Sequence, residues 1–266
     1  METPHLTPEQ EYINLQMHVS EAMVADGPRF QDANPMSSYV LHWRLHEAMR
    51  RLDHADPTIP RDSKILILCA SDGLEGTALA DLGWSNITVS DLSQTAANTA
   101  VLRDPRLKAM VINAEDSGLP RDAYDIVLIQ DGLHHLQRPV QGFTEMLRIA
   151  SRAVIFMEPH QSVVGRRIGT EWEIHGDAVN YVFRWSKRLV QDVASSYLGR
   201  DSFQNLSFSF WHHNPVFYKI GRRLGSGTFA ITCLRVLKGT LDVLLSSSGN
   251  SMCGMVLKNK PAIKAS

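Results

Sequence analysis

Two adjacent histidines and a glutamate stand where two neighbouring strands are expected to end. His134 and His135 follow the apolar run DIVLIQD, and Glu158 closes the next run, AVIFMEP. A histidine whose pKa lies near 7 can take a proton from a hydroxyl group. A carboxylate beside it can orient the ring and stabilise the imidazolium. These residue types in this order indicate general base catalysis, with Glu158 as the partner of the base.

Adjacent side chains diverge, so we expect only one histidine of the pair to enter a pocket. An ordinary structural histidine and a Glu-Pro strand terminator remain the alternatives. A second pair, His212 and His213, together with His160, makes a metal-assisted reaction conceivable. No histidine pair has a recognisable metal-ligand spacing, however. We therefore expect no metal site.

Short apolar runs alternate with segments of helical length, as in βαβ units that build a parallel sheet. The expected strands are 65–70, 87–91, 109–113, 125–131 and 153–159. Helices are expected at 7–25, 37–53 and 229–245, a loop plus a helix at 160–199, and a last strand at 250–260. This pattern predicts an α/β fold with a doubly wound sheet.

The first strand leads into the turn SDGLEG, a dinucleotide fingerprint whose first glycine is replaced by Ser71. Asp72 would place a negative charge where a pyrophosphate must approach the backbone. A cationic ligand without phosphate suits such a turn better. Asp91 ends the second run, close to the spacing at which an acidic residue meets ribose hydroxyls. Capping of the helix that begins near Ser93 is the alternative role.

Four segments in order carry a family resemblance: ILILCASDGLEG, ITVSDLS, NAEDSGLPRDAYDIVLIQDGLHHLQRP and AVIFMEPH. Together they resemble the class I (Rossmann-like) S-adenosylmethionine-dependent methyltransferases. This resemblance implies a mostly parallel seven-stranded sheet with an N-terminal helical cap and C-terminal helical insertions. The expected divisions are a cap over 1–60, a cofactor-binding core over 61–160, and a part over 161–266 that completes the sheet and forms the acceptor pocket.

The resemblance also implies roles for individual residues. The methionine part of the cofactor would lie against Cys69, Ala70, Ser71, Asp72 and Gly73, with Gln130 near the same end. Asp91 would hold the ribose, Leu92 would pack on the adenine, and Asn113, Ala114 and Glu115 would border it. His134, the first histidine of its pair, would be the base. The sequence departs from the family at Ile67, where an acidic residue is usual, and at Cys69 and Ser71, where glycines are usual.

The implied reaction is methyl transfer from S-adenosylmethionine to a small molecule, at a hydroxyl oxygen. Aromatic residues after Pro159 favour an apolar pocket for a small acceptor. Three alternatives stay open. These are C-methylation that uses Glu158 and aromatic rings, an NAD(P)-dependent oxidoreductase, and a non-catalytic cofactor-binding subunit.

Composition argues against two classes of partner and for one compartment. The formal charge of −1 and the isoelectric point near 6.8 give no basic surface for nucleic acid or a membrane. The three cysteines form no CxxC pair, and the first residues lack a secretory signal pattern. We expect a cytoplasmic protein, and the sequence leaves room for a homodimer.

Overall fold

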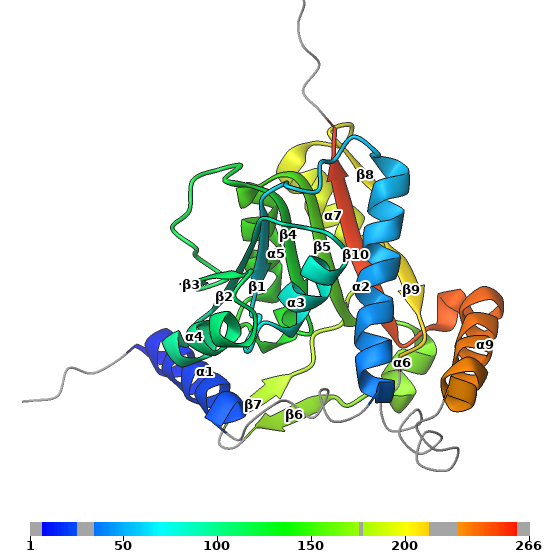
Figure 1. The fold of residues 1–266 in the computed structure, drawn as a ribbon, viewed down its shortest axis with the longest axis horizontal. Coiled ribbons are helices and arrows are strands. Elements are labelled where there is room, and N and C mark those ends of the chain that lie inside the picture. Colours follow the sequence, from blue (N-terminus) through cyan, green and yellow to red (C-terminus); the bar gives the residue numbers. More distant parts are fainter. Residues whose placement is uncertain (1–6, 26–34, 176–177, 213–227, 260–266) are drawn as a thin grey trace, which may run out of the picture.

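The computed structural model describes residues 7–25, 35–175, 178–212 and 228–259, and in this part of the chain one large sheet carries helices on both faces (Figure 1). The strand order is β3-β2-β1-β4-β5-β10-β8, and β9 also pairs with β10. The first five strands run parallel: β1 Ile65–Leu68, β2 Ile87–Asp91, β3 Lys108–Val111, β4 Tyr124–Gln130 and β5 Ala150–Pro159. All five lie where the apolar runs predict them.

Alternating side chains of these strands enter two separate cores. Ile65 and Ile67 face one cluster, whereas Leu66 and Leu68 face the other. Successive residues of a strand point to opposite faces, so an unbroken apolar run is what a sheet covered on both sides requires.

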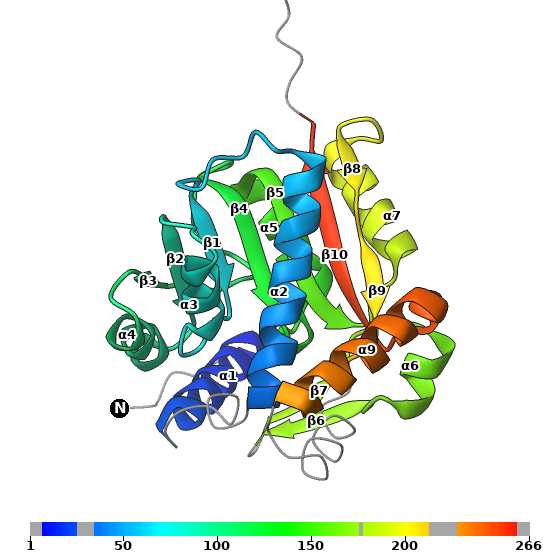
Figure 2. The ribbon, with the colours of Figure 1, turned by 45° about the vertical axis from the view of Figure 1, so that its right-hand side comes forward.

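Five helices supply the two covering layers. One cluster contains residues of α2 (Pro35–Ala55), α3 (Leu74–Asp81) and α4 (Gln94–Arg103). The other contains residues of α5 (Pro139–Ile149) and α7 (Lys187–Leu198). Figure 2 shows α2 lying along the sheet near β10. The segment 1–60 is predicted to form a single helical cap. In the structure α2 belongs to a core layer, and only the helix before it covers an end of the sheet.

The sheet is completed by antiparallel strands. One edge of β10 (Ser251–Lys258) pairs with β5, and its other edge pairs with both β8 (Phe203–Asn205) and β9 (Phe208–Phe210). Since β8 meets residues 256–258 and β9 meets residues 251–253, the eight strands fill seven positions. The expected mostly parallel Rossmann-like sheet is confirmed.

A hairpin of β6 (Trp172–His175) and β7 (Ala178–Tyr181) interrupts the region expected to be loop plus helix. Figures 1 and 2 place it, together with α1 (Pro8–Ala25), at one end of the sheet. The remaining elements are α6 Val163–Ile168, α9 Thr228–Leu244 and the short 3₁₀ helices η1 Leu133–His135 and η2 Ser246–Ser248. None of the described helices has the length and apolar character needed to cross a bilayer.

Candidate functional site

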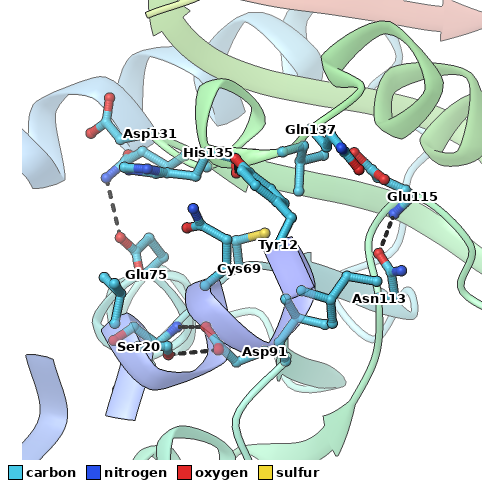
Figure 3. A pocket seen from close by; sticks show the side chains of 18 residues that line it. Tyr12, Ser20, Cys69, Glu75, Asp91, Asn113, Glu115, Asp131, His135 and Gln137 are labelled. Carbon is cyan, nitrogen blue, oxygen red and sulfur yellow. Dashed lines mark hydrogen bonds between the residues drawn. The ribbon is translucent and has the colours of Figure 1, made fainter. Parts of the chain in front are cut away.

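A cavity of about 510 Å³ lies between α1 and the carboxyl ends of β1, β2 and β4 (Figure 3). Ligands of open α/β sheets bind at this edge. The cavity is lined by Tyr12, Ile13, Gln16, Val19, Ser20, Cys69, Ser71, Glu75, Asp91, Leu92, Asn113, Glu115, Gln130, Asp131, Gly132, His135, Leu136 and Gln137. Seven of the residues predicted to bind a cofactor are among them: Cys69, Ser71, Asp91, Leu92, Asn113, Glu115 and Gln130.

The turn after β1 has left-handed backbone at three alternate positions. The φ angles are 51° at Cys69, 47° at Ser71 and 78° at Gly73. Two of these positions are those at which the sequence departs from the family's glycines, and glycine is the residue that adopts such angles without strain. The turn therefore has the backbone conformation that glycines adopt, although Cys69 and Ser71 stand where the family usually has glycines.

Asp91 is fixed at the end of β2 by donors from three segments. One carboxylate oxygen accepts the Ser71 N–H at 2.9 Å, and the other accepts the Ser20 hydroxyl at 2.7 Å and the Ser93 N–H at 3.1 Å. Figure 3 shows Ser20 reaching Asp91 from α1. The side chain that caps α4 is Ser93, which accepts the Ala96 N–H. Asp91 is thus held at the cavity wall and is not the N-cap.

The prediction that the Asp72 side chain faces the cofactor is wrong. Its carboxylate is buried and lies 2.7 Å from the Arg103 guanidinium of α4, away from the cavity. Glu75, in the first turn of α3, lines the cavity instead. Asp72 precedes the N-cap Gly73, whereas Glu75 lies in the first turn of α3, and the sequence pattern did not reveal where that helix begins.

The cavity wall is acidic. Glu75, Asp91, Glu115 and Asp131 contribute carboxylates, and the described lining contains no lysine or arginine. Two of these acids have a cationic partner outside the wall: Arg138 for Glu115 and Arg44 for Asp131. Burial raises the pKa of Asp131, but the Arg44 guanidinium at 2.8 Å outweighs it and lowers that pKa to about 2. An acidic wall favours a ligand that carries positive charge.

Two buried polar atoms of the cavity wall, Ser71 Oγ and Gln130 Oε1, make no hydrogen bond within the described residues. Gln130 Nε2 donates to Glu75 Oε1 at 3.3 Å, which directs the amide into the cavity wall. Buried polar groups are rarely left unsatisfied in native proteins, so a bound molecule with donor groups fits this part of the wall.

Of the two adjacent histidines, His135 lines the cavity, where His134 was predicted. His134 is 5 % exposed and does not line the cavity, whereas His135 does. Glu158 Oε2 lies 2.5 Å from His134 Nδ1, and Glu158 Oε1 accepts the N–H groups of Gly132 and Leu133. The predicted pairing of His134 with Glu158 is present, but it is buried behind the cavity wall.

The surroundings of His134 do not suit a base at neutral pH. Its Nε2 atom lies 3.4 Å from a carboxylate oxygen of Glu173. Burial lowers the pKa of His134, but Glu158 and Glu173 outweigh burial and raise the pKa well above its ordinary value. Both ring nitrogens face carboxylates and the side chain does not line the cavity, so His134 is not placed to take a proton from a ligand bound there.

His135 is held at the cavity by residues that sequence reasoning missed. Its Nδ1 atom lies 3.1 Å from Asn180 Nδ2 of β7, and its carbonyl oxygen accepts the Tyr12 hydroxyl at 2.6 Å. Its Nε2 atom lies 4.0 Å from Glu173 of β6. No motif marks Tyr12, Glu173 or Asn180. The alternating polarity of the hairpin sequence, within the region predicted as loop plus helix, is the signal that could have identified the last two.

The other predicted residues lie outside the cavity wall. Ala70 and Ala114 are buried in the two cores, and Gly73 contacts α4, where an added Cβ would lie 2.7 Å from the Ala100 side chain. His160 Nδ1 contacts the Gly249 carbonyl at 2.8 Å. His213 lies outside the described residues. Among those described, no aromatic residue after Pro159 lines this cavity, and an aromatic acceptor pocket stays a prediction.

Replacing Ser71 by glycine is expected to stabilise the free protein by about 1 kcal/mol and to weaken cofactor binding. Glycine relieves the left-handed backbone and removes a buried hydroxyl without a partner, but it also removes a group that a ligand could use. Urea denaturation and calorimetric titration measure the two effects. Asp122→Gly is the control, because Asp122 has φ 58° but is not among the residues that line the cavity, so the change should leave binding unchanged. Loss of stability in Ser71→Gly would contradict this account.

Comparisons with known proteins agree with this geometry. Residues 68–157 match a family model described as a methyltransferase domain. A search of curated proteins found no match to the sequence. Among solved structures, magnesium protoporphyrin IX methyltransferase from Synechocystis PCC 6803 with bound S-adenosylmethionine is 12% identical, with a TM-score of 0.55, over 97% of this chain and 100% of that one.

Two further solved structures have the same fold. A candidate sarcosine dimethylglycine methyltransferase from Galdieria sulphuraria is 15% identical, with a TM-score of 0.54, over 94% of this chain and 98% of that one. An S-adenosylmethionine-dependent methyltransferase from Thermotoga maritima is 13% identical, with a TM-score of 0.51, over 91% and 99%. At such identities the likeness concerns the fold.

Proposed function

Since residues 68–157 are a methyltransferase domain of the class I, Rossmann-like, S-adenosylmethionine-dependent family, we propose that this enzyme methylates a hydroxyl oxygen of a small-molecule acceptor. The observation that carries the proposal is the cavity wall of four carboxylates without a described lysine or arginine. It suits a sulfonium nucleoside and disfavours a diphosphate.

The residues of the wall fit the parts of this cofactor. We infer that Asp91, at the cavity wall, accepts hydrogen bonds from ribose hydroxyls in competition with the Ser20 hydroxyl of α1. Ser71 Oγ and Gln130 Oε1 are buried acceptors suited to the ammonium group. Glu75, beside Gln130, supplies the negative charge for which Asp72 was the expected source. The cofactor provides an electrophilic methyl group, and the chain has to align the acceptor with it.

Transfer to a hydroxyl releases a proton that the protein has to accept or pass on. The acceptor oxygen forms a bond to the methyl carbon as the carbon–sulfur bond breaks, and the O–H proton leaves. We assign the receipt of that proton to His135, because it lines the cavity beside Glu173. His134 and Glu158 hold the loop after β4 through the contacts described above, so we assign them a positioning role.

Two alternatives find less support. For a C-methyltransferase, Glu158 would have to act as a base, yet it is 1 % exposed and both its oxygens already hold partners. For an oxidoreductase, the acidic wall would have to bind a dinucleotide diphosphate. The net charge of −1 continues to argue against a nucleic-acid acceptor.

The proposal is tested by following a labelled methyl group. The enzyme is incubated with a small-molecule extract and either unlabelled or methyl-labelled S-adenosylmethionine. Products are sought that gain 14 Da with the unlabelled cofactor and carry the label with the labelled one. His135→Gln should lower transfer by roughly 10²–10⁴-fold while cofactor affinity stays near that of the wild type. The matched control is His160→Gln, which should keep full transfer. Undiminished transfer in His135→Gln would reject the role of His135.

A further inference from the structure

One cluster of potential metal ligands occurs in the described residues: His134, His135 and Glu173 each offer a ligand atom, and these atoms lie within 4.8 Å of one another. We propose that these three residues, the histidine–glutamate cluster, bind a divalent transition-metal ion of the zinc type. Binding of the ion does not depend on the proposed function, but its use in catalysis does.

The distances in the cluster are close to those of a metal site. Glu173 Oε2 lies 3.4 Å from His134 Nε2 and 4.0 Å from His135 Nε2. Zinc–ligand bonds of about 2.1 Å in tetrahedral directions place neighbouring ligand atoms about 3.4 Å apart. One pair therefore already has the required separation. The second pair is wider, and the ligand atoms of His134 and His135 lie within 4.8 Å of each other, so closure on an ion requires side-chain rotation of Glu173 and His135, which are both partly exposed.

The outer contacts of both imidazole rings are those that metal-bound histidines use. A ligating histidine normally donates its second ring N–H to a carboxylate or an amide oxygen. His134 Nδ1 faces Glu158 at 2.5 Å, which leaves Nε2 directed toward Glu173. Glu158 is itself fixed by the Gly132 and Leu133 N–H groups. The orientation of His134 is thus set by the backbone.

The Asn180 side chain can accept a hydrogen bond from His135, as Glu158 does from His134, when its amide nitrogen and oxygen exchange positions. Tyr12 has a single hydroxyl proton, yet its oxygen lies 2.6 Å from the His135 carbonyl and 2.9 Å from Asn180 Oδ1. Turning the Asn180 and Gln16 amides lets Asn180 donate to Tyr12 and to Gln16. The Asn180 oxygen then accepts from His135 Nδ1–H, which leaves Nε2 as the ligand atom. The nitrogen and oxygen of an amide are exchanged by such a turn without any change of shape.

The cluster lies where a metal ion could act on the acceptor. His135 lines the cavity, and the side chains of His135 and Glu173 are 27% and 32% exposed, against 5% for His134. Three protein ligands leave a position for an oxygen ligand. An acceptor hydroxyl bound there would have a lowered pKa. With the ion bound, His135 would be a ligand and no longer the group that receives the proton, which would instead leave to solvent or to the second oxygen of Glu173 before or during methyl transfer.

Cobalt binding to the untagged full-length chain, stripped with chelator, tests the site. We expect one Co²⁺ per chain, with visible absorption bands of a low-symmetry site, and displacement by Zn²⁺. Glu173→Gln and His135→Ala should weaken binding at least 100-fold, and Asn180→Ala about 10–100-fold. His160→Ala should bind like the wild type. Thermal melting identifies any variant that fails to fold, and the conservative Glu173→Gln keeps the test valid in that case.

Absence of stoichiometric Co²⁺ or Zn²⁺ binding would overturn the proposal, as would equal affinity in wild type and Glu173→Gln. The cluster would then be a proton-bridged ion pair of the His134 imidazolium with Glu158 and Glu173. Titration of metal-free protein with S-adenosylmethionine separates this outcome from failure of the proposed function, because cofactor residues such as Asp91 and Gln130 are not in the cluster.

Discussion

Replacing Glu158 by alanine should lower the free energy of unfolding by about 3–5 kcal/mol, the usual cost of removing one partner of a buried ion pair. The variant removes the carboxylate that faces the buried His134 ring and removes the acceptor of the Gly132 and Leu133 N–H groups. Urea denaturation followed by circular dichroism measures the loss.

Two further variants make this prediction specific. Glu158→Gln keeps an oxygen for the two N–H groups and should lose less stability than Glu158→Ala. Glu171→Ala, at an exposed position before the hairpin, should stay within about 0.5 kcal/mol of the wild type. A loss below about 1 kcal/mol in Glu158→Ala would contradict the buried network described here.

Replacing Asp91 by alanine should weaken S-adenosylmethionine binding by about 10–100-fold. Hydrogen bonds to a charged group contribute about 1.5–3 kcal/mol each, and Asp91 is the only described carboxylate that ends β2 at the cavity wall. The variant also leaves the Ser71 N–H without its acceptor, which loosens the turn after β1. Isothermal titration calorimetry measures the change.

Ser20→Ala is the matched control for Asp91. It removes a hydroxyl that occupies the Asp91 carboxylate at 2.7 Å but leaves the carboxylate in place. Its affinity for the cofactor should equal or exceed that of the wild type. Binding by Asp91→Ala within threefold of the wild type would show that the ribose is held elsewhere.

The sheet and the position of the cavity could be predicted from local patterns. Buried parallel strands are unbroken apolar runs, and a small-residue turn after the first of them marks the ligand-binding edge. Ser71 and Asp91 were predicted at that edge and lie 2.9 Å apart, backbone nitrogen to carboxylate. This part of the site consists of residues that directly follow or end a strand, so its position can be predicted almost entirely from the order of the strands in the sequence.

The rest of the site depends on side-chain direction and on contacts between distant segments. Asp72 and Glu75 differ in direction because α3 begins at Leu74, and His134 and His135 differ because they lie on the short helix η1. Asn180 meets Tyr12 across 168 residues. The hairpin that carries Asn180 exposes its apolar residues, such as Trp172 and Ile174, so no buried run marked it as strand.

The central claim is that the acidic cavity binds a sulfonium nucleoside and not a dinucleotide. Calorimetric titration of the purified chain with S-adenosylmethionine, S-adenosylhomocysteine and NAD tests this claim most directly. We predict one equivalent of each sulfur nucleoside bound per chain and no heat from NAD. Binding of NAD by a protein that ignores both sulfur nucleosides would contradict the account.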